Sequence, residues 1–167
     1  MKLTDHFSLE ELIDSDTAVR MGIDNAPPEA IGTNLAVLAA GLEKVRTLLG
    51  YPVVIKSGYR CENLEKVLCE KDFAQWCRTH GKNPLAAWPE YFARKAHPRG
   101  YAADFICPAF GSPVEIVRKI RGAGMRFDQV IEEGSWVHVS FDPRLRGETL
   151  TARFASDGTP TYTNMAA

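Results

Sequence analysis

The segment DQVIEEGSWVHVS, residues 128–140, decides the fold because it has the form of a β-hairpin with a glycine-serine turn. In its second arm the valines alternate with polar or aromatic residues, so the valines face the core and His138 faces the other side. Glu132 and Glu133 are adjacent in the first arm and therefore lie on opposite faces of their strand. The segment predicts two paired strands that carry an imidazole and one carboxylate on the same face.

A second polar segment, HPRGYAAD at residues 97–104, places His97 and Asp104 seven positions apart. On one helix they would be about 10 Å apart, so we expect a loop that leads into a strand, with Gly100 at the turn. His97, Asp104 and His138 would form a zinc ligand set that leaves a fourth position open. A free carboxylate nearby can then deprotonate a water at that position. The two segments together predict a catalytic zinc site.

Arg60 follows the apolar run at residues 53–55 and the tripeptide Ser57-Gly58-Tyr59, so we expect it at the end of a buried strand. A guanidinium fixed at the edge of a cleft can pair with a carboxylate at two points or stabilise an oxyanion. On this segment alone, an ordinary surface salt bridge explains Arg60 equally well.

Composition favours one globular domain over residues 1–167, because 45% of the residues are hydrophobic and 25% are charged. The net charge of −1 provides no overall attraction to nucleic acid or to anionic membranes. The N-terminus lacks the apolar segment of a signal peptide, and no stretch approaches the ~18 apolar residues of a membrane span. We therefore expect synthesis in the cytoplasm, no membrane insertion and no nucleic-acid partner.

The cysteines are Cys61, Cys69, Cys77 and Cys107. Cys77 and His80 form a Cys-x-x-His pair, but the paired spacing of a zinc knuckle is missing. Without an export signal, we expect all four thiols to be reduced and to bind no metal.

Capping residues and apolar periodicity predict the helices. We expect a short helix from the capping box at residues 8–11, a long one from Ile31 to Gly50, one from Glu62 to Arg78, and one from Ser112. Residues 81–89 are expected to form a loop. The polar tail at residues 143–167 is expected to carry a last hairpin around Asp157-Gly158.

In combination these segments resemble the zinc D-Ala-D-Ala carboxypeptidase family, and within it the phage and prophage cell-wall peptidases. The family's pattern is Ser-Gly-Tyr-Arg, then His-x-x-Gly-x-Ala-x-Asp, then an acid followed by Trp-x-His. The chain has Ser57-Gly58-Tyr59-Arg60, then His97, Gly100, Ala102 and Asp104, then Glu133 and Trp136-Val137-His138. The likeness covers about residues 5–142 and includes an opening segment, HFSLEE, at residues 6–11.

The resemblance implies an α+β fold in which a small antiparallel sheet carries the zinc site and helices pack on the sheet's other face. It implies Zn²⁺ bound by His97, Asp104 and His138, with Glu133 as the base. Arg60 would bind the substrate carboxylate or the developing oxyanion. The implied activity is hydrolysis of an amide bond in peptidoglycan stem peptides by a phage or prophage lysin, which reaches the cell wall after holin release or virion delivery.

Two features leave the choice of residues and substrate open. The turn before Trp136 is one residue short, so counting back from His138 selects Glu132 as the base, whereas counting from Asp128 selects Glu133. We prefer Glu133, because a turn absorbs a deletion more easily than a strand does. In addition, the segment at residues 61–96 is longer than in typical phage members.

Other functions are compatible with the same residues. Within the same chemistry, the alternative is an L-alanyl-D-glutamate or cross-bridge endopeptidase, because both kinds of substrate present carboxylates. Another class of alternative is a zinc-bearing module without turnover, which binds the wall or forms part of a virion. An acid available as base argues against the second alternative.

Overall fold

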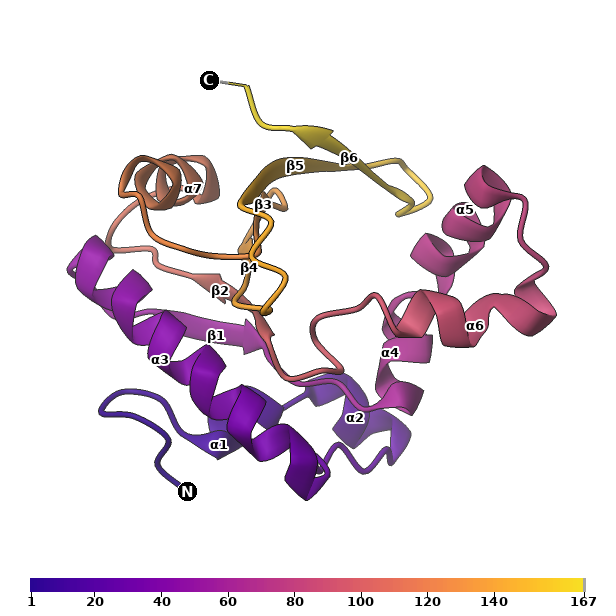
Figure 1. The fold of residues 1–167 in the computed structure, drawn as a ribbon, viewed down its shortest axis with the longest axis horizontal. Coiled ribbons are helices and arrows are strands. Elements are labelled where there is room, and N and C mark those ends of the chain that lie inside the picture. The colour runs from indigo at the N-terminus through magenta and orange to yellow at the C-terminus, as the bar shows by residue number, and fades with distance from the viewer. Residues whose placement is uncertain (167) are drawn as a thin grey trace.

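The computed structural model describes residues 1–166, and it has an α+β architecture built around one six-stranded sheet (Figure 1). The strand order across the sheet is β1-β2-β4-β3-β5-β6. The strands are β1 (Val54–Ser57), β2 (Ala102–Ile106), β3 (Gln129–Glu132), β4 (Val137–Ser140), β5 (Glu148–Phe154) and β6 (Pro160–Asn164). The predicted fold class is confirmed, as are the hairpin of β3 and β4 and the C-terminal hairpin of β5 and β6.

The sheet differs from the expected antiparallel one in a single pair, because β3 and β5 are parallel. Residues 141–147 carry the chain from the end of β4 back to the start of β3, and the buried side chain of Asp128 holds them there. Arg146 donates to it through Nε at 2.9 Å and through Nη2 at 2.6 Å, and the amide of Glu148 donates to its backbone carbonyl at 3.0 Å. This two-point ion pair starts β5 beside β3 and in the same direction.

The helices are α1 (Leu9–Ile13), α2 (Asp16–Met21), the 3₁₀ helix η1 (Glu29–Ile31), α3 (Gly32–Leu49), α4 (Glu62–Leu68), α5 (Glu70–His80), α6 (Pro84–Phe92) and α7 (Pro113–Gly122). Capping boxes at Ser8 and Ser112 start α1 and α7 as predicted, and α3 ends at Gly50 with a φ of 72°. Within residues 1–166, no helix combines the length and the apolar character that crossing a bilayer requires.

The segment between Arg60 and His97 departs from the prediction. One helix from Glu62 to Arg78 was expected, but the backbone leaves the helical region at Cys69 (φ −104°, ψ 11°), so α4 and α5 are separate. The expected loop at residues 81–89 was also wrong, because α6 occupies most of it.

The sequence signal for α6 is local. Asn83 accepts a hydrogen bond from the amide of Leu85, and Pro84 occupies the first turn. Aromatic packing then holds α6 against α5, since the ring of Phe73 lies 5.2 Å from Trp88 and 5.1 Å from Tyr91 between centroids.

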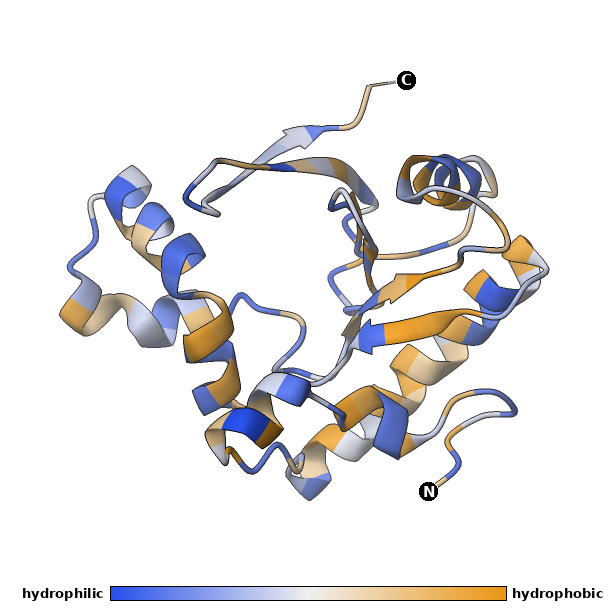
Figure 2. Ribbon diagram, turned by 180° about the vertical axis from the view of Figure 1, so that it is seen from behind, coloured by the Kyte–Doolittle hydropathy of each residue, from blue (hydrophilic) through white to orange (hydrophobic). Residues whose placement is uncertain are grey.

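The hydrophobic core lies between one face of the sheet and the pair α3 and α7, whereas α4, α5 and α6 lie beyond the other face (Figure 1). In the ribbon of Figure 2, hydrophobic residues are concentrated along the central strands and the long helix α3. The buried core side chains include Leu35, Leu38, Leu42, Phe105, Ile116, Ile120, Val137 and Val139. Strand residues between them therefore point away from the core, toward the side where α4 begins.

Candidate metal centre

His97, Asp104 and His138 come from three separate parts of the chain. Asp104 on β2 lies directly opposite His138 on β4 in the antiparallel ladder, so the two side chains share a face. His97 belongs to the turn at residues 97–100, in which the amide of Gly100 donates to the His97 carbonyl at 3.0 Å. Sheet pairing positions two of the three residues, and a tight turn before β2 supplies the third.

The turn needs a glycine for two reasons. Gly100 has a φ of +73°, and a Cβ atom there would lie 2.7 Å from Cγ2 of Ile31. Hydrogen bonds to α3 fix the rest of the turn, because Asn34 accepts from the Tyr101 hydroxyl at 2.7 Å and donates to the Arg99 carbonyl at 2.9 Å. Helix α3 thus supports the loop that carries His97.

The three side chains converge on one point. His138 Nδ1 lies 3.0 Å from Asp104 Oδ1, and His97 Nε2 lies 3.2 Å from both of these atoms. All three residues are buried, with exposed fractions of 6%, 6% and 8% for His97, Asp104 and His138. Within residues 1–166 they form the one group of at least three His, Cys, Asp or Glu side chains placed to hold a metal ion, and no cysteine belongs to it. The four cysteines are free thiols in the structure; their reduced state in solution stays a prediction.

The chemistry of these atoms fits a cation. The carbonyl of Gly58 only accepts hydrogen bonds, so His97 Nδ1, 2.6 Å away, is the donor and Nε2 carries the lone pair. Burial lowers the pKa of His97, and the charge of Arg60 lowers it further, which favours the neutral imidazole. Burial alone would raise the pKa of Asp104, but its interactions with His97 and Arg60 outweigh it and hold that pKa well below its usual range. A neutral imidazole and an ionised carboxylate are the forms that bind zinc.

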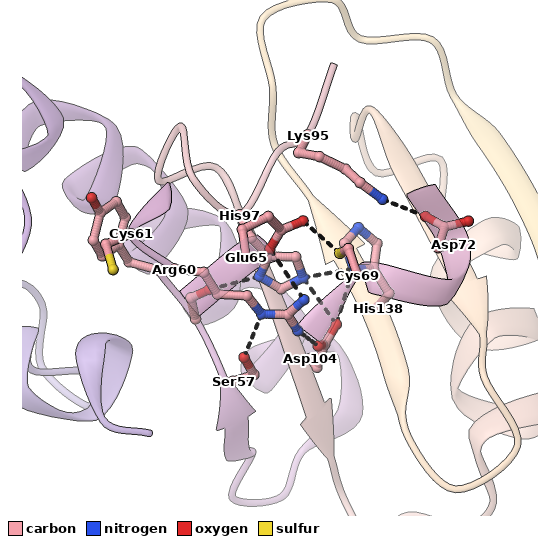
Figure 3. A network of polar contacts seen from close by, with 12 residues as sticks. Ser57, Arg60, Cys61, Glu65, Cys69, Asp72, Lys95, His97, Asp104 and His138 are labelled. Atoms are coloured by element: carbon pink, nitrogen blue, oxygen red, sulfur yellow. Dashed lines mark hydrogen bonds and ion pairs between the residues drawn. The ribbon is translucent and has the colours of Figure 1, made fainter. Parts of the chain in front are cut away.

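The charges around the group also favour a divalent cation. Figure 3 shows the polar network around the three residues, and its charged members are Arg60, Lys95, Glu65, Asp72 and Asp104. Glu133 lies nearby and adds a further carboxylate. Two of these are cations and four are carboxylates, so their formal charges sum to −2. A divalent ion held by the three ligands would balance that charge in a poorly solvated region. The residues present therefore fit Zn²⁺.

The structure places Arg60 behind Asp104 rather than at an exposed edge. Its Nη2 forms an ion pair with Asp104 Oδ2, its Nε donates to Ser57 Oγ at 2.9 Å, and its Nη1 lies 3.6 Å from Glu65 Oε2. The arginine side chain is 14% exposed. Asp104 thus turns one oxygen to the two imidazoles and the other to the guanidinium (Figure 3).

Glu132 and Glu133 have different surroundings. The amide of Glu133 donates to the carbonyl of Trp136 at 3.0 Å, which extends the β3–β4 ladder and puts Glu133 on the face of His138. Glu133 Oε2 accepts from the indole N–H of Trp136 at 2.6 Å. Burial raises the pKa of Glu133, and the negative charge of Asp104 adds to this shift.

The carboxylate of Glu132 is occupied elsewhere. Its Oε2 lies 2.7 Å from Nη1 of Arg153, and its Oε1 accepts from the amide of Gly134 at 2.8 Å. The structure therefore brings Glu133, and not Glu132, to the side of the sheet that carries the three ligand candidates. The catalytic roles of Glu133 and Arg60 stay predictions.

Sequence reasoning missed a tyrosine on this face. The parallel pair β3–β5 sets Thr151 beside Glu132, so the following residues, Ala152 and Glu133, share the opposite face. The antiparallel pair β5–β6 sets Tyr162 beside Ala152 and thus on the face of Glu133. The alternation Thr-Tyr-Thr at residues 161–163 signals a strand, but nothing local to the tail indicates its parallel neighbour.

The surroundings of Tyr162 agree with this placement. The residue is 42% exposed; partial desolvation raises its pKa, and the carboxylates of Asp72 and Glu133 raise it further. The turn of the β5–β6 hairpin also contacts α5, because Lys71 Nζ donates to the carbonyl of Asp157 (Figure 1). Thus α5 and the C-terminal hairpin meet on the side of the sheet that carries the histidines.

Comparison with known proteins gives a similarity over the N-terminal part of the chain. A family model described as Peptidase M15 matches residues 5–69, a stretch that includes Arg60 and ends before His97. No curated protein and no solved structure matches the chain. The matched stretch covers less than half of the 167 residues, and the buried His-Asp-His group lies downstream of it.

Proposed function

We propose that this protein is a zinc peptidase that hydrolyses an amide bond in peptidoglycan stem peptides, with D-Ala-D-Ala as the preferred bond. The observation that carries the proposal is the convergence of His97, Asp104 and His138 on one buried point, with Glu133 on the same face of the sheet. The match of residues 5–69 to the M15 family model supports the reaction class.

His97 Nε2, His138 Nδ1 and Asp104 Oδ1 would hold the zinc ion. When bound, zinc would polarise the scissile carbonyl and lower the pKa of water to about 7, which supplies a nucleophile at neutral pH. The hydrogen bond from His97 Nδ1 to the Gly58 carbonyl fixes the ring so that Nε2 faces the other two ligand atoms.

Glu133 would move the proton. The indole N–H of Trp136 binds Oε2 and orients the carboxylate, so Oε1 is the atom that would accept a proton from water and return it to the leaving amine. Burial raises the pKa of Glu133 in the metal-free protein, which favours proton acceptance by its carboxylate.

Arg60, which contacts Asp104, would in addition bind an anionic group of the substrate. A guanidinium has five N–H donors, and the hydrogen bonds to Ser57 and Asp104 engage two of them, while Glu65 Oε2 lies 3.6 Å from Nη1. The remaining donors would bind the substrate carboxylate or the developing oxyanion. Because the motifs of the chain resemble those of phage and prophage cell-wall peptidases, we also propose that the protein is a phage or prophage lysin. It would act on the wall after holin release or virion delivery.

Zinc analysis combined with digestion of purified sacculi tests the proposal. The protein should hold about one zinc, and mass spectrometry should show loss of the terminal D-alanine from pentapeptide stems, with no product from Glu133→Gln. A new amino terminus at D-glutamate or in the cross-bridge would indicate an endopeptidase instead. A full equivalent of zinc without any product would indicate a binding module.

A further inference from the structure

Glu65 is a buried acid that the proposed reaction does not use. It lies on α4 and is 1% exposed. Its Oε1 accepts from the thiol of Cys69, one helical turn later, at 2.9 Å, whereas its Oε2 has no hydrogen-bond partner within residues 1–166. Burying a carboxylate oxygen without a hydrogen-bond donor opposes folding, so a charged group nearby is expected to compensate for it.

The charged group nearest to Glu65 Oε2 among its described ion pairs is the guanidinium of Arg60. Glu65 Oε2 lies 3.6 Å from Nη1 of Arg60, while Nη2 of the same guanidinium pairs with Asp104 Oδ2 (Figure 3). Glu65, Arg60 and Asp104 therefore form a series of carboxylate, guanidinium and carboxylate. The series ends at the oxygen of Asp104 that faces away from His97 and His138.

This series has a consequence for the orientation of Asp104. Arginine stays charged, and a buried guanidinium takes the orientation that satisfies the charges around it. With Glu65 at Nη1 and Ser57 at Nε, Arg60 is held on two sides, and its Nη2 stays directed at Asp104 Oδ2. That contact leaves Oδ1 turned toward the two imidazoles.

We propose that Glu65 is a positioning residue for the metal ligand Asp104 and that it acts through Arg60. The inference rests on the proposed function only in that His97, Asp104 and His138 must hold zinc. Loss of the Glu65 charge would act in two ways of the same sign. It would loosen the guanidinium that orients Asp104, and it would leave the positive charge of Arg60 uncompensated beside a dication.

The test measures zinc affinity by competition with a chelator, without any substrate. Glu65→Gln keeps the shape of the side chain and should weaken zinc binding by roughly 10- to 100-fold, the range for partners of metal ligands. Glu62→Gln is the matched control, because Glu62 lies on the same helix and binds Lys66 and Trp88 instead. Its zinc affinity should stay within about twofold of the wild type, since its carboxylate is half exposed and does not contact Arg60.

Measuring the same substitution in an Arg60→Gln variant distinguishes an effect transmitted through Arg60 from a general effect on α4. In Arg60→Gln protein, the further change Glu65→Gln should weaken zinc binding clearly less than it does in the wild-type background, because the residue that transmits the orienting effect is gone. An equal loss in both backgrounds would overturn the proposal. The visible spectrum of the cobalt-substituted protein provides an independent signature, which should change in Glu65→Gln and not in Glu62→Gln.

The outcomes also separate this inference from the proposed function. If wild-type protein binds zinc and Glu65→Gln binds it equally well, the inference fails and the proposed site stands. If His138→Ala keeps the zinc affinity of the wild type, the site assignment fails and the inference fails with it. Should Glu65→Gln fold poorly, Cys69→Ala removes the donor that orients Glu65 Oε1, and it should weaken zinc binding in the same direction; unchanged affinity in Cys69→Ala would then count against the proposal.

Discussion

Burial of side chains has opposite effects on folding stability at the two faces of the central strands. On β2 and β4, Phe105 and Val139 pack against α3 and α7, and removal from water stabilises them. On the other face of the same strands, Asp104 and His138 are almost equally buried but carry polar atoms that face one another. Burial of such groups opposes folding unless partners or an ion satisfy them. The apolar face is therefore expected to determine stability, and the polar face to determine metal binding and activity.

The largest expected effect is loss of metal from the polar face. His138→Ala should lose most of the zinc and all measurable peptidase activity, because the two remaining ligands rarely retain the ion. Metal analysis after dialysis and an assay on muropeptides measure both quantities. Retention of a full equivalent by the double variant His97→Ala, His138→Ala would show that the ion binds elsewhere.

A change on the apolar face should have the opposite pattern. Phe105 is fully buried, and Phe105→Ala should lower the free energy of unfolding by about 3–5 kcal/mol, the usual cost of such a cavity. Denaturant unfolding of the metal-free protein measures it, with Asp104→Asn on the same strand as the comparison. The contrast between the faces would disappear if Asp104→Asn destabilised the metal-free protein as much as Phe105→Ala does.

The acids of the β3–β4 hairpin provide the next contrast. Glu133→Gln should leave zinc in place and reduce turnover by at least ~10²-fold, the lower end for general acid–base catalysis. Glu132→Gln should keep its turnover and lose stability instead, because its carboxylate binds Arg153 and the amide of Gly134. The reverse result in steady-state kinetics would identify Glu132 as the base.

The smallest expected effect concerns Arg60. Lysine keeps the charge but not the planar fork, so Arg60→Lys should lower kcat/KM by roughly tenfold, about 1.4 kcal/mol, when zinc is saturating. Arg60→Ala should have a greater effect. Wild-type kcat/KM for both variants on a defined muropeptide would limit Arg60 to its contacts with Asp104 and Glu65.

Features that depend on neighbouring residues could be predicted from the sequence. The capping boxes at Ser8 and Ser112, the end of α3 at Gly50 and the alternation around His138 all belong to this group. Such signals extend over a few positions, because a cap or an alternating face involves only residues close together in the chain. The break at Cys69 has no comparable signal, and the signal for α6 at Asn83-Pro84 was read as part of a loop.

The sequence by itself determined which chemical groups are available: two imidazoles, an aspartate in a strand, and a pair of acids of which one faces His138. Only the tertiary structure decided how these groups are arranged. It turned Oδ2 of Asp104 to Arg60, placed Glu65 behind that arginine, and brought Tyr162 to the same face through the parallel pair β3–β5. The physical reason is that strand pairing and burial join residues far apart in the chain, so their geometry depends on contacts that no local pattern contains.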